Sequence, residues 1–300
     1  MIKKYPRDMV GYGQKTPKVK WPNNAKLALQ IVLNYEEGSE NCVLHGDKTS
    51  EVFLSEIIGA QPVKGRHINM ESLYEYGSRR GFWRIHKLFQ EKKIPITIFG
   101  VGMALERNLE ICQAIKESDY EVASHGWRWI DYQKVSRSTE KKHMQLAIKS
   151  IEKIFGKRPL GWYTGRCSPN TRDLVMEEGG FIYDSDSCSD DLPYWEVRGK
   201  KRQLIIPYTL DNNDMRFATN QGFNSGEQFY TYLKDSFDAL YNEDSHPKMM
   251  SVGLHCRIIG RPGRIQSLKK FLDYVLKYKD VWICKRIDIA KHWIKNYSIK

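Results

Sequence analysis

The chain has 300 residues, of which 41% are hydrophobic and 28% are charged. This composition is ordinary for a globular protein and excludes a disordered chain, and the length accommodates one large α/β domain or two small ones. A formal net charge of +12 arises from 48 Lys and Arg against 36 Asp and Glu. The basic residues never form a long run, so we interpret the charge as a solvated surface and expect no nucleic-acid partner.

The cysteines and the N-terminal sequence indicate where the protein resides. Cys42, Cys112, Cys167, Cys188, Cys256 and Cys284 include no CxxC pair and no zinc-finger spacing. In a chain of this length they do not form a disulfide framework, so we expect reduced thiols. Residues 1–20 have no apolar signal core, and no apolar run approaches the roughly 18 residues that span a bilayer. We therefore expect a cytoplasmic protein with no membrane partner, which argues against an enzyme that trims a cell-wall polymer.

Taken in chain order, the predicted elements alternate between strands and helices. Short apolar runs predict strands at residues 26–34, 94–101, 121–124, 160–164, 181–183, 204–207, 249–254 and 281–284. Amphipathic patterns predict helices at 138–155, 227–241 and 266–278, with Ser138 as N-cap of the first and Gly156 beyond its end. About eight strands in this order favour an α/β fold of the distorted (β/α) barrel type. The alternative of an open doubly wound sheet lacks a GxGxxG or Walker motif.

The chain shows no internal repeat or obvious linker, so residues 1–300 are predicted to form a single domain with an N-terminal extension at 1–25. The segment 42–81 is long, partly irregular and rich in Gly, Glu, His and Arg. Loops of this length in compact domains are usually functional or disordered. We expect this segment to be a lid or a subunit contact.

Chemically versatile residues follow the C-terminal ends of five predicted strands. They are Glu36 and Glu37, then His125, Trp127 and Trp129, then Arg166, then Asp184, and finally His255 and Arg257. Each has an ordinary structural explanation: adjacent glutamates are mostly solvated, a single histidine or arginine is mostly a satisfied structural group, and tryptophan is mostly core. In a barrel, however, these strand ends converge on one catalytic face. Together they predict an active site.

The order and spacing of these motifs resemble the polysaccharide-deacetylase superfamily, whose fold is a distorted (β/α) barrel. The resemblance rests on Glu36-Glu37, residues 125–129, 166–169 and 184–195, and Leu254 before His255. Metal-dependent members carry two aspartates in the first motif and two histidines, four residues apart, that hold a metal. Here both acids are glutamates, and the position four after His125 is Trp129, which cannot ligate a metal. One histidine and one carboxylate make a poor zinc site.

These departures resemble one branch of the superfamily, the cofactor-independent allantoinases. Longer stretches also look like that branch: residues 71–79, 161–166, 190–195, 207–210, 213–217 and 253–264. The resemblance covers residues 34–293. It implies that allantoin, a small-molecule substrate, is hydrolysed at its hydantoin ring amide to allantoate in purine catabolism. It also implies no metal, no other cofactor, and a homotetramer.

The resemblance also implies roles for the site residues. Glu36 or Glu37 deprotonates water, a choice that the sequence leaves open, while His125 holds water or substrate and His255 protonates the leaving nitrogen. A carboxylate beside the apolar ring of Trp129 is expected to have a raised pKa. The predicted substrate-binding residues are Arg166, Arg257, Trp127, Trp129, Trp162 and Asp184.

Two alternatives stay open at this point. The first is a metal-dependent de-N-acetylase of polysaccharide or peptidoglycan, supported by the shared fold and opposed by Trp129 and the two glutamates. The second is a non-catalytic carbohydrate-binding protein on a decayed barrel. Against the second, a decayed site has no physical reason to keep acid, base and hydrogen-bond donors at five strand ends.

Overall fold

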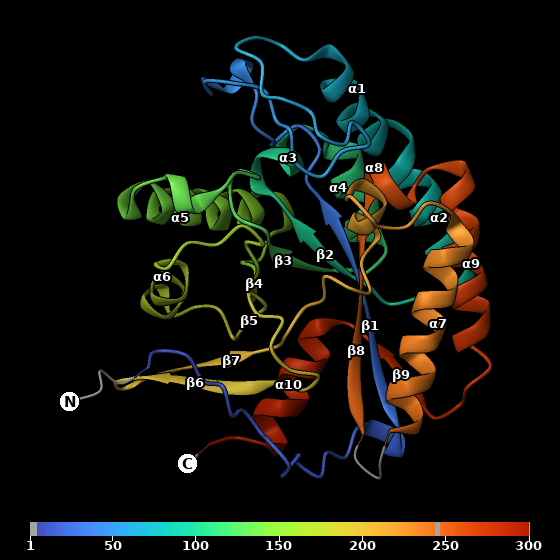
Figure 1. Ribbon diagram of the computed structural model, residues 1–300. Coiled ribbons are helices and arrows are strands. Elements are labelled where there is room, and N and C mark those ends of the chain that lie inside the picture. Colours follow the sequence, from blue (N-terminus) through green and yellow to red (C-terminus); the bar gives the residue numbers. More distant parts are fainter. Residues whose placement is uncertain (1–4, 244–246, 300) are drawn as a thin grey trace.

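The computed structural model describes residues 5–243 and 247–299, and it shows a curled sheet surrounded by helices (Figure 1). The nine strands are β1 (Leu27–Tyr35), β2 (Thr97–Gly100), β3 (Glu121–Ser124), β4 (Gly161–Trp162), β5 (Tyr183–Asp184), β6 (Tyr194–Arg198), β7 (Lys201–Ile205), β8 (Lys248–His255) and β9 (Val281–Cys284). Their order is β6-β7-β5-β4-β3-β2-β1-β8, and β9 pairs with β1. All pairings are parallel except that of β6 with β7. The predicted α/β barrel and its distortion are confirmed.

Helices cover the outside of the sheet. They are α1 (Ile68–Tyr76), α2 (Phe82–Lys92), α3 (Gly102–Glu106), α4 (Leu109–Glu117), α5 (Arg137–Phe155), α6 (Thr171–Glu178), α7 (Gly226–Asn242), α8 (Cys256–Ile259), α9 (Pro262–Val275) and α10 (Arg286–Asn296). A π-helical turn, η3 (Gly77–Gly81), joins α1 to α2. Short 3-10 turns are η1 (Pro22–Asn24), η2 (Val43–His45), η4 (Tyr132–Lys134) and η5 (Asp214–Ala218). In Figure 1, α7 and α9 flank the side of β1 and β8, α5 and α6 lie on the opposite side, and residues 42–67 extend over the upper end of β1.

Most predicted elements occur close to their expected positions. Strands β3 and β9 match their predicted bounds, whereas β4 and β5 are only two residues long. The N-cap of helix α5 lies two residues earlier than predicted: it is Ser136, not Ser138, and its hydroxyl accepts a hydrogen bond from the Thr139 amide at 3.2 Å. Gly156 ends the helix with a φ of 72°, as expected of a left-handed C-cap glycine. Residues 1–4 of the predicted N-terminal extension lie outside the described residues.

The first strand shows how the sequence sorts side chains between two layers. All nine residues of β1 are buried, as expected of a strand covered on both faces. Leu29, Ile31 and Leu33 pack in the core formed with the outer helices, whereas Ala28 and Val32 belong to the second core inside the sheet. Side chains alternate between faces along a strand. Even-numbered residues of β1 therefore point into the barrel and odd-numbered ones point toward the helices.

The barrel is incomplete between β7 and β8. In the described chain, an isolated bridge between Asn213 and Gly253 stands where a ladder would close the barrel. Arg286, fully buried at the start of α10, ties the two sides of this seam together. Its guanidinium donates hydrogen bonds to Ser251 on β8 at 2.9 Å and to the Pro207 carbonyl after β7 at 2.9 Å. It also bonds Gln30, Ser185 and the Ile206 carbonyl.

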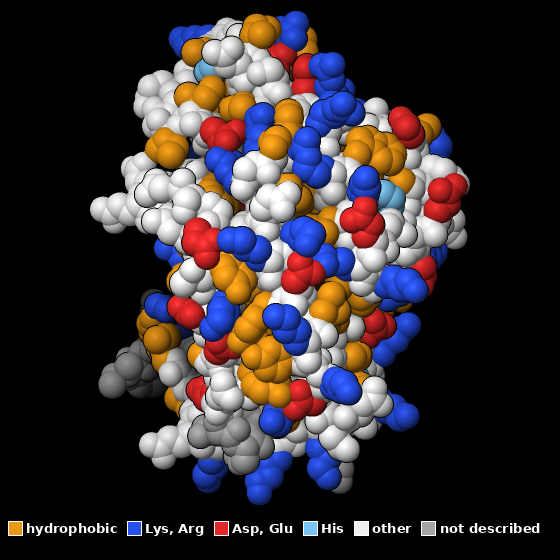
Figure 2. All heavy atoms as spheres, turned by 90° about the vertical axis from the view of Figure 1, so that its right-hand side faces the viewer, with side chains coloured by type: hydrophobic (Ala, Val, Ile, Leu, Met, Phe, Trp, Pro, Cys, Tyr) orange, Lys and Arg blue, Asp and Glu red, His pale blue; other side chains and the backbone are white. Residues whose placement is uncertain are grey.

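Charged side chains interleave on the face that α7 and α9 form. Figure 2 shows Lys and Arg scattered among Asp and Glu there. Two pairs are helical i,i+4 neighbours, Lys234–Asp238 and Lys269–Asp273, with N···O distances of 2.5 and 2.8 Å. Exposed pairs of this kind contribute about 0.3–0.5 kcal/mol each, so this face is solvated rather than strongly stabilising. Over the described residues, no helix combines the length and the apolar character required to cross a bilayer.

η3 and α8 cross closely at Gly81, and this close approach requires a residue without a side chain at position 81. A Cβ on Gly81 would overlap the backbone carbonyl of Cys256, which cannot rotate away. We expect Gly81→Ala to lower the free energy of unfolding by about 1–3 kcal/mol in urea denaturation, as for other overpacked sites. Gly263→Ala is the matched control, because its added Cβ meets nothing within 4 Å in α9. Equal stability of both variants would contradict this account of the crossing.

Candidate active site

A buried cluster of charged side chains forms where β1, β3 and β8 end. Because Asn34 of β1 is in register with His255 of β8, Glu36 comes to lie beside that histidine. Glu36 Oε1 lies 3.3 Å from His125 Nε2 and 3.4 Å from His255 Nε2. Glu36 Oε2 accepts a hydrogen bond from Arg257 Nη1 at 2.7 Å. We call Glu36, His125, His255 and Arg257 the Glu36 cluster; none of its members is more than 5% exposed.

Asp214, in η5, fixes the orientation of His255. Its Oδ1 lies 2.7 Å from His255 Nδ1, and its Oδ2 accepts hydrogen bonds from the backbone amides of His255 and Ile259 at 2.8 and 3.0 Å. Asp214 is fully buried, so this contact is not weakened by water. The imidazole therefore presents Nε2 to Glu36. The sequence analysis gave Asp214 no role, because it follows no strand; its only signal was an acid within the 213–217 stretch.

The cluster sets opposite protonation states on its two central groups. Burial alone would raise the pKa of Glu36, but the charges of Arg257 and His255 and hydrogen bonds with the two histidines lower it well below its ordinary value. Burial alone would lower the pKa of His255, but Glu36 and Asp214 raise it to about 9. Near neutral pH, Glu36 is therefore ionised and His255 is protonated. For Glu36 the expected rise in pKa does not occur: burial is the largest single cause, but Arg257, His255 and the hydrogen bonds of the two histidines together outweigh it.

Glu37, in the turn that follows β1, faces away from the cluster centre. Its Oε2 accepts a hydrogen bond from the Glu36 amide at 3.0 Å, and its Oε1 lies 3.6 Å from Arg257 Nη1. The carboxylate packs against Gly77 of η3, where an added Cβ would overlap it. Burial is the main cause that raises the pKa of Glu37, and the neighbouring Glu36 adds to it. Glu37 therefore forms the wall behind the cluster.

The segment that precedes α1 covers the cluster. Trp129 stacks on Phe53 with ring centroids 5.9 Å apart and contacts Tyr74 at 6.0 Å. The Arg166 guanidinium lies 5.1 Å above the Trp129 ring and 3.2 Å from Glu51 Oε2. Residues 42–67 are largely irregular, whereas α1 and η3 make the last part of the predicted 42–81 loop helical. The role of this segment as a lid stays a prediction, and so does its role as a subunit contact.

Three predicted substrate-binding residues lie away from the cluster. The Trp162 ring packs on Phe181, 5.1 Å away, in a separate core under α5 and α6. Trp127 packs against Gly102 of α3. Asp184 is fully buried and ion-paired with Arg172, and burial raises its pKa to about 7. Both tryptophan side chains pack toward the helices, so the structure does not bring them to the Glu36 cluster, and a contact of either ring with substrate stays a prediction.

Tyr163, which the sequence analysis missed, takes the inward position next to Trp162. Its ring lies 4.9 Å from the His125 ring and stacks on Phe99 at 4.6 Å. Tyr208 packs on it at 4.9 Å. Alternation along the 160–164 strand would have pointed to Tyr163, because neighbouring residues of a strand face opposite sides.

The residues of the cluster do not fit a divalent metal. Among the described residues, no three His, Cys, Asp or Glu side chains form a group that could hold one. Arg257 already places a positive charge against Glu36, and Trp129 offers no acceptor. The positive charge beside Glu36 is therefore the guanidinium of Arg257.

Several polar atoms at the cluster are buried and lack a hydrogen-bond partner within the described part of the chain. They are His125 Nδ1, Arg257 Nη2 and Asn34 Oδ1. Buried polar groups without partners are costly and rare in native proteins. The set contains both donors and acceptors, which suits a small ligand that carries carbonyl and N–H groups.

Comparisons with known proteins agree with this geometry. The polysaccharide deacetylase family model matches residues 67–176. A Schizosaccharomyces pombe (strain 972) protein whose name places it among the polysaccharide deacetylases is 41% identical over 98% of both chains. The structure of PuuE allantoinase superposes with a TM-score of 0.96 and 54% identity over 99% of both chains. That of a probable polysaccharide deacetylase from Pseudomonas aeruginosa PAO1 gives 0.97 and 56%, over 99% of this chain and 100% of the other. The chain therefore belongs to the polysaccharide deacetylase family of hydrolases and has that family's distorted barrel.

Proposed function

We propose that this enzyme is an allantoinase that hydrolyses the hydantoin ring amide of allantoin to allantoate without a metal. The observation that carries the proposal is the Glu36 cluster, in which an ionised carboxylate faces a protonated histidine beside a fixed guanidinium. These groups supply a base, an acid and an oxyanion donor from the chain itself. The 54% identity to PuuE allantoinase over 99% of both chains supports the same substrate.

In the proposed mechanism, Glu36, Arg257 and His255 act in turn on water, the ring carbonyl and the ring nitrogen. Glu36 takes a proton from water, and the water oxygen bonds to the ring carbonyl carbon. The charge that develops on the carbonyl oxygen is stabilised by Arg257, whose Nη2 has no partner among the described residues. His255 then donates its proton to the ring nitrogen as the C–N bond breaks. The 3.4 Å between Glu36 Oε1 and His255 Nε2 allows the first proton to pass to the histidine and restore both groups.

The predictions of location, oligomeric state and metabolic pathway belong to this proposal. We expect a cytoplasmic homotetramer that acts in purine catabolism and takes allantoin as its small-molecule partner. Sedimentation equilibrium of the purified protein measures the oligomeric state. A stable monomer at micromolar concentration would contradict the tetramer and leave the proposed reaction intact.

The decisive experiment is allantoin hydrolysis by purified protein before and after exhaustive chelation, with metal content measured on the same sample. We expect allantoate formation to survive chelation in metal-free protein. The second candidate, a metal-dependent de-N-acetylase, is favoured by the names of the S. pombe and P. aeruginosa relatives. Release of acetate from an N-acetylated sugar oligomer that stops on chelation, with no turnover of allantoin, would establish that candidate instead.

The raised pKa of His255 predicts the alkaline limb of the pH profile. Since the acid must be protonated to donate, activity should be present below pH about 9 and should fall tenfold per pH unit above it. Asp214→Asn removes one of the charges that raise this pKa, so the limb should move to lower pH. The measurement is kcat/KM against pH for both proteins. An unchanged limb in Asp214→Asn would mean that another group controls it.

A further inference from the structure

Glu36 lies in the tight turn that follows β1, and we call residues 36–40 the Glu36 turn. The Glu36 carbonyl accepts hydrogen bonds from the Ser39 amide at 3.1 Å and from the Ser39 hydroxyl at 2.5 Å. Gly38, the third residue of the turn, has a φ of 89°, and a type II turn requires a positive φ at that position. The ladders of β1 end at Tyr35, so other contacts must hold Glu36 within reach of the two histidines.

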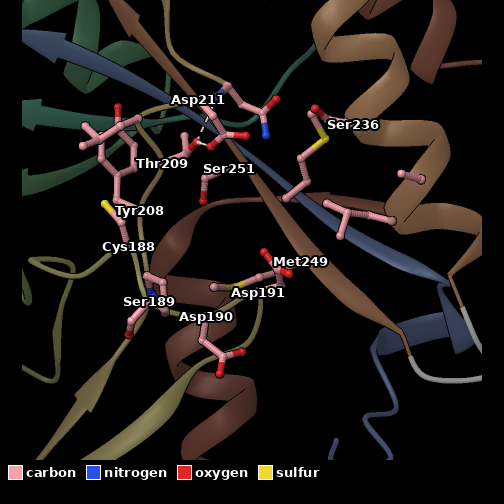
Figure 3. Close-up of a pocket in the computed structure, with 16 residues that line it drawn as sticks. Cys188, Ser189, Asp190, Asp191, Tyr208, Thr209, Asp211, Ser236, Met249 and Ser251 are labelled. Atoms are coloured by element: carbon pink, nitrogen blue, oxygen red, sulfur yellow. Dashed lines mark hydrogen bonds between the residues drawn. The ribbon is translucent and has the colours of Figure 1, made fainter. Parts of the chain in front are cut away.

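On the seam side, the end of β1 borders a hollow. Tyr208, which accepts a hydrogen bond from Asn34 Nδ2 at 3.0 Å, lines a cavity of about 450 Å³ together with Ser251 of β8 (Figure 3). None of the residues that line this cavity belongs to the Glu36 turn or, within the described part of the chain, bonds it. The anchor of the turn lies instead on the opposite side, in the loop after β3.

Arg128, in that loop, supplies the anchor. Its Nε donates a hydrogen bond to the Ser39 carbonyl and its Nη2 donates one to the Glu40 carbonyl, both at 3.1 Å. The Trp129 amide also donates to the Ser39 carbonyl at 3.1 Å. Arg128 is only 7% exposed, and hydrogen bonds are stronger where water is excluded. Because the same loop begins with His125, Arg128 ties the main chain of the base to that of its histidine partner.

The charge of Arg128 is balanced outside the active site. Its Nη2 lies 2.5 Å from Asp47 Oδ2, which also accepts a hydrogen bond from the Cys42 amide at 2.8 Å. Burial and the charge of Arg128 lower the pKa of the neighbouring His45, and they lower that of His143 to about 4. Both histidines are therefore neutral near pH 7, and Asp47 carries the counter-charge. The two bonds to carbonyls remain as the contribution of Arg128 to the Glu36 turn.

We propose that Arg128 is a positioning residue, which holds Glu36 against His125 and His255 by bonding the carbonyls of the Glu36 turn. It acts through the turn and not on the reacting atoms. A guanidinium suits this task, because its planar fork reaches two carbonyls at once, whereas a lysine ammonium of the same charge is a single point. The effect on kcat rests on the proposed function, whereas the placement of Glu36 does not.

Arg128→Lys keeps a positive charge beside Asp47 and removes the fork. We expect kcat for allantoin to fall ~10–100-fold, as for a misplaced catalytic group, while KM changes little. Ser39→Ala, which removes the hydroxyl that bonds the Glu36 carbonyl, should also lower kcat. The double variant should lose less than the product of the two losses, because both substitutions act through one turn.

Arg158→Lys is the matched control. The Arg158 guanidinium bonds Glu178 of α6 at 2.8 and 2.9 Å and makes no bond to the Glu36 turn. We expect this variant to keep the wild-type kcat and KM. Urea denaturation of all variants measures how much stability each substitution removes.

A titration of His255 tests the placement of Glu36 without any substrate. Glu36 is one of the charges that raise the pKa of His255 to about 9, so a displaced Glu36 must lower that pKa. NMR of ¹⁵N-histidine-labelled protein follows the imidazole, whose signal is assigned by its absence in His255→Gln. We expect a lower pKa in Arg128→Lys and an unchanged one in Arg158→Lys. Since no substrate is needed, this result holds even if wild-type protein fails to hydrolyse allantoin.

A purely structural role of Arg128 gives a different pattern. Arg128→Lys would then unfold at lower urea concentration, while the folded protein would keep the wild-type kcat and the wild-type pKa of His255. That pattern overturns the proposal. A lower kcat with an unchanged pKa of His255 also overturns it, because Glu36 would not have moved. If Arg128→Lys does not fold, the same two measurements on Ser39→Ala decide between these outcomes.

Discussion

Glu36→Gln is expected to lower kcat for allantoin by ~10²–10⁴-fold, the usual contribution of general base catalysis. The amide keeps the shape of the side chain but cannot take a proton from water. Glu36 is the carboxylate that faces both histidines, at 3.3 and 3.4 Å, and the one whose pKa is lowered, so it is ionised when the reaction begins. The measurement is steady-state allantoate formation, with far-UV circular dichroism to verify folding.

Glu37→Gln is the matched control on the neighbouring residue. Glu37 points toward η3, and its raised pKa favours the neutral form that glutamine imitates. We expect it to change kcat less than tenfold, below the range typical of a catalytic base. The reverse pattern, with Glu37→Gln inactive and Glu36→Gln active, would transfer the role of base to Glu37. Full activity in both variants would end the carboxylate-base mechanism.

Arg257→Met is expected to lower the free energy of unfolding by about 3–5 kcal/mol at pH 7, because it leaves Glu36 buried without its cation. Arg257 is 2% exposed and donates to Glu36 at 2.7 Å. Its guanidinium also lies 4.3 Å from the Tyr74 ring and donates to the Leu54 carbonyl at 3.3 Å, so the covering segment contacts it as well. Urea denaturation measures the loss, and hydrolysis should fall with it.

The sign of the pH dependence distinguishes lost charge pairing from lost packing. In wild type, the lowered pKa of Glu36 contributes stability that is present above its unfolded pKa and is lost as pH falls through the folded value. In Arg257→Met, Glu36 takes up a proton more readily, and the neutral form is cheaper to bury. The stability gap between the two proteins should therefore narrow from pH 7 to pH 5. Glu36→Gln/Arg257→Met should recover most of the loss, whereas a gap independent of pH would indicate lost packing alone.

The sequence was sufficient to predict the barrel, because buried strands and amphipathic helices leave strong local patterns. Strand β6 was missed because its residues are half-exposed and its charges do not form an apolar run. The convergence of Glu36, His125, His255 and Arg257 followed from their places after parallel strands. Glu36 and Glu37 lie beyond the end of β1, where strand alternation no longer applies, so the choice between them stayed open in the sequence analysis.

Other features of the site depend on contacts between distant segments. Asp214 reaches His255 across 41 residues from an irregular turn, and no local pattern encodes that contact. The raised pKa expected of a carboxylate beside Trp129 occurs at Glu37 but not at Glu36, because the approach of Arg257, 221 residues away, and of His255 was not apparent from the chain. Trp162 packs toward the helices, because its neighbour Tyr163 takes the inward position on that strand. Contacts between residues so far apart in the chain are set by tertiary packing, and the periodicity of the sequence does not predict them.

The way the seam is held has a consequence for how the protein is made. Strand β1 is synthesised before its long partner β8 and its neighbour β9, which both follow it by more than 200 residues. Arg286, which joins β8 to the chain after β7, emerges later still. Domains fold as units during synthesis, at about 5–20 residues per second. The edge of β1 that pairs with β8 and β9 therefore waits at least ~10 s for these strands. During that interval its apolar residues must be shielded by early helices or by a chaperone.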